Sequence, residues 1–448
     1  MSLLAGLSAG MFLRRLHDYE KRSHPVRGAE AQQQRLDRRM EYRAAVLVRA
    51  PSVPMAIDGL PVLGAWLHGD AEECRRGEWA VLPEGHIVAI GASGSGKTTA
   101  IKQLVTASLL GDGLRQRVVW LDGKEDNETG PELARQVVAG GLDHREVRLW
   151  PMSGPMDLWR GTGQELADRF HALADWSEPY YEAVARAAAK LSIEDPRGLP
   201  RSLDDILARM ESTAMKVSWA GTPNAEVAGK LSAELLGGIR LRYHALAAAL
   251  RNIGAIPEGP GGWSFEDATL VHCALPTSTT PLVAAGFGRA LLIDFVSYIR
   301  NPMRREMSLP MTCVIEELGA IIQKDEVAAA SVVETLERAR SAGVRMVLSG
   351  QVVASFGEPQ TQARLLTSGA TILAMRMSDP EPVLSLLGTR ARPESSIGVG
   401  YDGVLLDQGS LRMQDQWAVH PSTMRSLETG RALLIRNGRF ALVQVPPR

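Results

Sequence analysis

The feature that most constrains this chain is the run GASGSGKT, from Gly91 to Thr98, which matches the pattern G-x-x-x-x-G-K-[ST]. The apolar run 87–90 before it favours a strand, and residues 98–110 after it favour a helix. A strand, a glycine-rich loop and a helix in this order are typical of a phosphate-binding loop. We therefore predict that ATP binds through Gly91, Ser93, Gly94, Ser95, Gly96, Lys97, Thr98 and Thr99.

The residue types in this loop have separate tasks. Glycines let the backbone approach a pyrophosphate and turn successive N–H groups toward the anion. Lys97 is expected against the β- and γ-phosphates, and the Thr98 hydroxyl is expected to hold Mg²⁺. The alternative is a glycine-rich turn with an incidental lysine, which the flanking strand and helix disfavour.

Composition limits the classes of partner. The chain has 448 residues, 45% hydrophobic and 23% charged, with a net charge of −1 and a pI of about 6.8. This excludes a broadly basic nucleic-acid binder, so any DNA contact must be local. The three cysteines form no C-x-x-C pair, which disfavours a zinc framework and is typical of a cytoplasmic protein. We find no apolar run of about eighteen residues, and so we expect no membrane-spanning helix.

The N-terminal segment is the exception in charge. Its first fifty residues hold ten arginines and lysines against five acids, and we predict a basic, mainly helical segment over residues 1–60. A solvated helix of mixed charge explains this run, and so does an anionic partner such as lipid headgroups or DNA. Residues 1–13 are open to interpretation as a surface helix, a segment lying on the inner face of the cell membrane, or the end of a longer segment lost to a start-site choice.

Strands and helices alternate after the glycine-rich loop, which indicates a doubly wound, mainly parallel α/β sheet. From about residue 164 the pattern changes to helices without strands, and strands resume near residue 268. We predict a P-loop NTPase core of RecA-like type with an inserted all-α domain. The expected division is 61–163 for the first part of the core, 164–255 for the insertion and 256–448 for the second part, which includes C-terminal strands.

Two acids follow the apolar run 311–315 directly. A P-loop enzyme needs one carboxylate to orient the magnesium shell and one to accept a proton from the attacking water. We assign the first role to Glu316 and the second to Glu317. The alternative is that the two acids only stabilise the N-terminus of a following helix, where negative charge is favourable.

Two further polar residues surround the next predicted strand, 344–350. Gln351 ends it, where ligands bind in open α/β sheets, so its amide is expected to meet the γ-phosphate or the attacking water. A loop amide that caps local backbone is the alternative. Arg340, near the end of the preceding helix, is either a finger that reaches a neighbouring subunit's nucleotide or a cation favoured by the helix dipole.

The chain resembles the conjugative coupling-protein ATPases of type IV secretion systems, which are TraD/TraG-like members of the FtsK and HerA motor superfamily. The resemblance rests on GASGSGKTT, VVWLDGKED, LWPMSGPMDLWRG, CVIEELGAI, ARSAGVRMVLSGQ and TSGATILAMRMSDPEPVLSLLG, which span roughly residues 78–388. It implies an ATP-driven DNA translocase that forms a homo-hexameric ring, with ATP at subunit interfaces and a relaxase or secretion-channel proteins as partners. It also supports the roles given to Lys97, Thr98, Glu317, Gln351 and Arg340.

Two departures from that family are visible. The magnesium acid is usually aspartate, whereas Glu316 is one methylene longer, and the paired membrane helices are missing. Two other functions therefore stay open: a secretion-type ATPase that moves or assembles protein, and a nucleotide-gated adaptor with weak hydrolysis.

Overall fold

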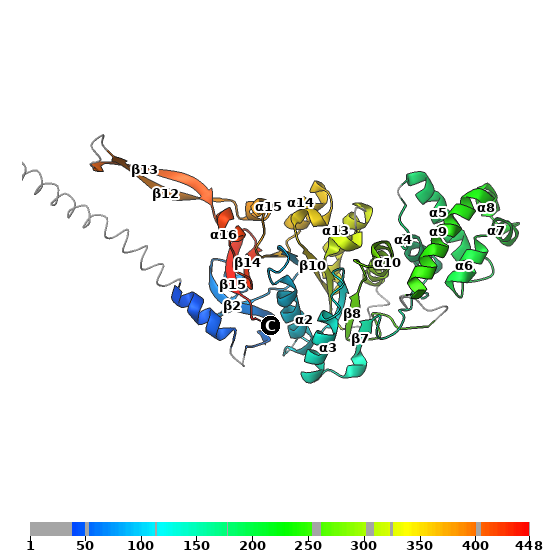
Figure 1. Cartoon of the computed structure of the whole chain (residues 1–448), viewed down its shortest axis with the longest axis horizontal. Coiled ribbons are helices and arrows are strands. Elements are labelled where there is room, and N and C mark those ends of the chain that lie inside the picture. The colour runs from blue at the N-terminus through cyan, green and yellow to red at the C-terminus, as the bar shows by residue number, and fades with distance from the viewer. Residues whose placement is uncertain are drawn as a thin grey trace, which may run out of the picture.

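A computed structural model describes residues 38–49, 53–112, 114–176, 178–252, 261–301, 309–322, 326–399 and 405–447. The molecule is elongated (Figure 1). A two-stranded ribbon lies at one end, a large sheet with its helices in the middle, and a group of helices at the other end.

The centre of the sheet is made of seven parallel strands, in the order β11-β5-β10-β9-β6-β8-β7. All seven carboxyl ends therefore lie at one edge, where ligands of open α/β sheets bind. The strands are β5 (Ile87–Ile90), β6 (Arg117–Asp122), β7 (Val147–Trp150), β8 (Leu270–Ala274), β9 (Met311–Glu316), β10 (Val344–Gly350) and β11 (Thr371–Ala374).

Alternate residues of these strands face two separate cores, as the pleat of a strand requires. Helices α2 (Lys97–Leu110) and α3 (Thr129–Ala139) cover one face. The other face is covered by α10 (Pro281–Arg300), α12 (Leu318–Ile322) and α13 (Glu326–Ala339), with α14 (Pro359–Thr367) packed beside α13. The predicted doubly wound α/β fold is confirmed.

Antiparallel strands extend the sheet beyond β11. The sequence analysis expected C-terminal strands, but it did not predict the strands that precede the glycine-rich loop. The C-terminal strands join the sheet next to β11, and the strands that precede the glycine-rich loop pair with them. Both ends of the described chain thus complete one sheet. The added strands are β14 (Arg431–Arg436), β15 (Arg439–Gln444), β2 (Leu60–Gly69), β4 (Trp79–Val81), β3 (Arg75–Arg76) and β1 (Ala56–Ile57).

Six helices lie among the described residues between β7 and β8, where the sequence predicted an all-helical insertion. Two of their starts carry typical signals: Thr162 and Glu165 form a capping box at α4, and Ser202 accepts a hydrogen bond from the Asp205 N–H at α6. Residues 225–252 form two helices, which are separated at residues 231–232. The six helices are α4 (Gly163–Ala172), α5 (Pro179–Ile193), α6 (Leu203–Arg209), α7 (Ser212–Trp219), α8 (Ala225–Lys230) and α9 (Ala233–Asn252).

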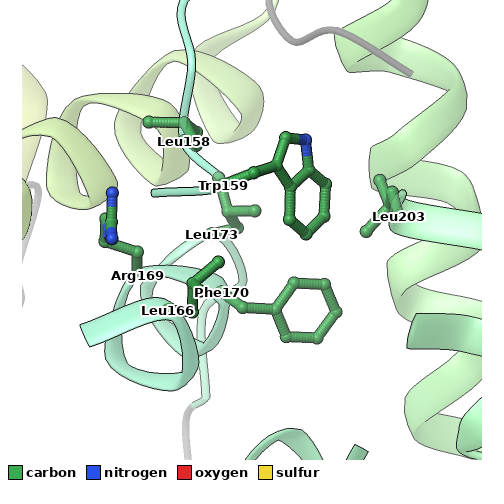
Figure 2. A pocket seen from close by; sticks show the side chains of 7 residues that line it. All are labelled: Leu158, Trp159, Leu166, Arg169, Phe170, Leu173 and Leu203. Atoms are coloured by element: carbon green, nitrogen blue, oxygen red, sulfur yellow. The ribbon is translucent and has the colours of Figure 1, made fainter. Parts of the chain in front are cut away.

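The insertion is fastened to the core where α4 crosses α10. The buried Arg169 on α4 pairs with the buried Asp294 on α10 at 3.2 Å. Gly286 lets the helices approach closely, because a Cβ there would lie 2.0 Å from the carbonyl oxygen of Leu173. A cavity of about 20 Å³ remains beside α4, and Figure 2 shows the rings of Trp159 and Phe170 facing Leu203 across it. This volume holds about one water molecule, so it is a packing gap and not a ligand site.

Helix α10 is the one helix among the described residues that is long and apolar enough, by length and composition, to cross a membrane. The sequence analysis found no uninterrupted apolar run there, because the helix contains Arg289 and Asp294. In the structure 78% of its apolar window is buried, with α4 and α12 packed against it. Helices α10 and α14 were both absent from the sequence prediction.

Within residues 1–60 the described part of the chain forms a helix over residues 38–47 and then the short strand β1. The helix is held by ion pairs of Arg43 with Glu78 and of Glu41 with Arg431, the latter at 3.0 Å. Arg14, Arg15 and residues 1–13 lie outside the described residues.

The ribbon that projects from the sheet consists of β12 (Thr389–Val399) and β13 (Leu405–Trp417), which pair with each other and with no other described strand. Short helices α15 (Glu381–Leu384) and α16 (Pro421–Arg425) flank its base. Arg390 at the base pairs with Asp70 and lies over the ring of Phe440, 5.7 Å from its centroid.

Candidate nucleotide-binding site

The glycine-rich loop joins β5 to α2 at the carboxyl edge of the sheet, as predicted. Gly94 and Gly96 have φ of +71° and +106°, a backbone region that favours glycine. Gly91 is needed for space, because a Cβ there would lie 2.9 Å from both the Met375 Cβ and the Ser95 Oγ. The loop is therefore shaped by its glycines as a phosphate cradle requires.

Other strand ends hold the loop from outside. The Gly91 N–H donates to the Gly350 carbonyl at 3.3 Å, and the Ala92 N–H donates to the Arg376 carbonyl at 2.7 Å. The Gly430 N–H donates to the carbonyl of Ser95 at 3.1 Å. The loop is thus braced by the ends of β10 and β11 and by the start of β14.

Lys97 is buried at the start of α2. Its ammonium donates to the Gly91 carbonyl at 2.5 Å and lies 4.0 Å from the Glu317 carboxylate. Burial lowers the pKa of Lys97, and the nearby charges of Glu317 and Glu316 oppose that shift. A cation held in this way at the mouth of the loop is placed to meet a phosphate anion.

Glu316 ends β9 opposite Asp122, which ends β6 in register with it. Both side chains are fully buried, and the Thr98 hydroxyl donates to Glu316. Burial raises the pKa of Glu316 to about 7, the charge of Asp122 acts in the same direction, and the Thr98 hydrogen bond opposes it. Two carboxylates buried this close favour a cation between or beside them.

The residues present fit magnesium. One carboxylate oxygen on each of Glu316 and Asp122 is buried without a hydrogen-bond partner, although that of Asp122 lies 3.6 Å from the His272 Nε2, and the Thr98 hydroxyl donates to the other Glu316 oxygen. No group of three or more His, Cys, Asp or Glu among the described residues is arranged to hold a metal ion. Mg²⁺ takes one or two carboxylates and completes its shell with phosphate and water, so this set suits it.

Glu317 has an unusual backbone. Its φ is +52°, which is uncommon for a residue with a side chain and costs on the order of 1 kcal/mol. It follows β9 directly, and its side chain is 15% exposed, whereas that of Glu316 is buried. The two adjacent acids are therefore in different settings: one is buried against Thr98, and the other is open to solvent near Lys97.

The structure separates the two remaining predicted residues. Gln351 is exposed and follows Gly350, whose carbonyl binds the glycine-rich loop, so it lies at the site. Arg340 begins the turn Arg340–Ala342 that precedes β10, so it lies at the amino-terminal edge, about 23 Å away along that strand. There its charge, after burial, is a cause of the lowered pKa of His86.

Sequence reasoning missed three contributors at this edge. Asp122, to which the sequence analysis gave no role, ends β6 beside Glu316. Lys124 places its ammonium 3.5 Å from the Thr98 hydroxyl oxygen. Arg376, which is half-buried, braces the loop through its carbonyl. The signal was the run LDGKED after a buried strand, because the carboxyl ends of neighbouring parallel strands meet.

No protein-family profile matches the sequence, and no curated protein matches it either. Solved structures do match. The bacterial conjugative coupling protein TrwBdeltaN70 matches with a TM-score of 0.59 and 15% identity, over 87% of this chain and 95% of that chain. VirB4 of Thermoanaerobacter pseudethanolicus matches with a TM-score of 0.57 and 15% identity, over 88% of this chain and 98% of that chain. This chain has the fold of TrwB and VirB4.

The fold-level resemblance to conjugative coupling ATPases is thereby confirmed, and with it the P-loop NTPase fold. TrwB in complex with ADP and Mg²⁺ also matches, with a TM-score of 0.54 and 15% identity, over 81% of this chain and 86% of that chain. The identities are low, so the roles of single residues stay predictions.

Proposed function

We propose that this chain is an ATPase of the conjugative coupling-protein type that uses ATP hydrolysis to move DNA. The observation that carries the ATPase proposal is the meeting of Lys97, Thr98, Glu316, Glu317 and Gln351 at one edge of the sheet, around a loop with phosphate-binding geometry. The fold shared with TrwB supports the coupling-protein type.

ATP and Mg²⁺ are the proposed cofactors. TrwB has been solved with ADP and Mg²⁺ and with a non-hydrolysable ATP analogue, at TM-scores of 0.54 and 0.51. In this chain the loop backbone and Lys97 would hold the phosphates. Thr98 and Glu316 would hold Mg²⁺, with Asp122 beside them, and the ion would supply charge neutralisation for the phosphates.

Glu317 is the proposed general base. Its partly exposed carboxylate can take a proton from a water at the mouth of the loop, 4.0 Å from the Lys97 ammonium. Gln351 would orient that water or the γ-phosphate from the end of β10. Glu316 cannot do the same task, since its buried carboxyl is engaged by Thr98.

The proposed assembly is a homo-hexameric ring with ATP at subunit interfaces and DNA in the centre. The position of Arg340 rules out a contact with its own subunit's nucleotide, so a role as a finger requires a neighbour seated on the amino-terminal edge. The division 61–163, 164–255 and 256–448, a relaxase or secretion-channel partner, and a cytoplasmic site at the inner membrane face belong to the same proposal.

The deciding experiment is steady-state ATP hydrolysis with and without single- and double-stranded DNA, at low and moderate salt. Lys97→Ala is the blank. A DNA motor is expected to show stimulation that the blank abolishes and that falls with salt, because contacts to DNA phosphates release counterions. Turnover that ignores DNA, with no DNA binding at low salt, would refute the DNA proposal.

A second candidate is an ATPase that moves or assembles protein. The match to VirB4, nearly as good as that to TrwB, favours this candidate. Stimulation of turnover by a partner protein and not by DNA would select it. A nucleotide-gated adaptor is excluded if Glu317→Gln abolishes substantial turnover while ATP binding survives.

A further inference from the structure

Lys124 is a second lysine at the nucleotide site, and the roles given above do not use it. It lies two residues beyond Asp122, on the loop between β6 and α3. Its ammonium donates to the Thr98 hydroxyl oxygen at 3.5 Å, while that hydroxyl donates to Glu316. The Thr98 oxygen thus presents its lone pair to a cation, as it would to a metal.

The loop that carries Lys124 is firmly held. The Lys124 N–H donates to the Asp122 carboxylate at 2.8 Å, and the Thr277 hydroxyl donates to the Gly123 carbonyl at 2.9 Å. The next residue, Glu125, has a φ of +59° and accepts hydrogen bonds from the backbone N–H and hydroxyl groups of residues 278 and 279. Such bracing fixes the backbone from which the lysine side chain reaches the site.

The negative charge around Thr98 favours the Lys124 ammonium at this position. The site gathers three carboxyl groups, on Asp122, Glu316 and Glu317, against the two ammonium groups of Lys97 and Lys124. Lys97 is bound to its own loop carbonyl. Lys124 is therefore the cation beside Thr98 and Glu316, and as an exposed residue it can swing away into solvent.

We propose that Lys124 is a positioning residue that acts as a stand-in for the metal: its ammonium takes the cation side of Thr98 in the metal-free protein, and Mg²⁺ displaces it. The inference rests on the proposed magnesium site at Thr98 and Glu316. It predicts that removing this lysine tightens metal binding. If the lysine were needed for local structure, its removal would weaken metal binding instead.

The test titrates Mn²⁺, as a spectroscopic probe for Mg²⁺, into the full chain alone and with ADP, followed by electron paramagnetic resonance. Lys124→Met removes the charge and keeps the stem, Lys124→Arg keeps a charge, and Lys230→Met is the control at an exposed surface lysine. We expect Lys124→Met to bind Mn²⁺ about three- to fivefold more tightly, in line with the loss of an exposed competing charge. Lys124→Arg is expected to stay closer to the natural protein, and the control to match it.

Unchanged or weaker Mn²⁺ binding by Lys124→Met overturns the inference. So does a large loss of metal-free ADP affinity without a change in Mn²⁺ affinity, since that would make Lys124 a phosphate ligand. The variants Thr98→Ala and Glu316→Gln distinguish a failure of the proposed metal site from a failure of the Lys124 inference. If both keep Mn²⁺ binding, the proposed metal site itself is wrong; if both lose it while Lys124→Met is silent, only the inference fails.

Discussion

Replacing Glu316 by glutamine should stabilise the nucleotide-free protein while it destroys magnesium-dependent nucleotide binding. The carboxyl is fully buried beside Asp122, and these two facts raise its pKa from 4.5 to about 7. The amide has nearly the same shape, still accepts from Thr98, and can donate to the neighbouring carboxylate. It removes a buried charge without leaving a cavity.

The size and sign of the expected change in unfolding free energy follow from the raised pKa of Glu316. The folded protein keeps this proton up to about pH 7, whereas the unfolded chain releases it near pH 4.5. The stability that the protonated carboxyl contributes is therefore present below pH 4.5 and lost as the pH rises through 7. A rise in the pKa from 4.5 to about 7 corresponds to about 3 kcal/mol. For a chain of 448 residues that is about 3 °C in Tm.

The assay is thermal unfolding from pH 5 to 8, with and without ADP and Mg²⁺. The matched control is Glu317→Gln, which makes the same charge change at a partly exposed site. The Glu316 variant should melt higher at pH 8, with the difference closing toward pH 5. Mg²⁺–ADP at 100 times its Kd should add about 2.7 kcal/mol to the natural protein and far less to the variant. A variant that is less stable at pH 8, or that keeps its magnesium dependence, would refute the reasoning.

Three further predictions concern the fold. Gly286→Ala should cost about 1–3 kcal/mol, because its Cβ would strike the backbone of α4, whereas Gly237→Ala, with open space around it, should be neutral or stabilising; urea unfolding compares them. Arg169→Met should cost about 3–5 kcal/mol by breaking its buried ion pair with Asp294, and adding Asp294→Leu should recover part of that loss in the same assay. Burial, and then the charges of nearby arginines, lower the pKa of His86 to about 4, so it contributes stability above pH 6.5 that is lost as the pH falls through 4. His86→Gln should flatten the dependence of unfolding free energy on pH between 6.5 and 4 by up to about 3 kcal/mol, and an unchanged slope would contradict this.

Much of the site could be read from the sequence because parallel strands end at one edge. Glu316, Glu317 and Gln351 each follow a run that had to be a buried strand, and the glycine-rich loop follows another. The same rule places Arg340 at the far edge, because it precedes the strand that Gln351 follows. That inference was available from the sequence and was not drawn.

The rest depended on tertiary pairing. Asp122 meets Glu316 only because β6 and β9 are neighbours in register, and strand order is not encoded in local periodicity. The pairing of the antiparallel strands could not be predicted for a related reason: β14 and β15 lie more than three hundred residues from β2, and short strands carry little pattern of their own. Helix α10 was not predicted, although its sequence is long and apolar, because the segment contains no recognisable motif.

The ribbon of β12 and β13 is connected to the phosphate loop through its base. Its base is tied by Arg390 to Asp70, whose carboxylate also accepts from the β15 backbone; β15 pairs with β14, and the residue before β14 holds the carbonyl of Ser95 in the phosphate loop. The ribbon extends for about 35 Å, so a tilt of about 5° at its base moves the far end by about 3 Å. The ribbon is thus connected to the phosphate loop through a continuous series of side-chain and backbone contacts.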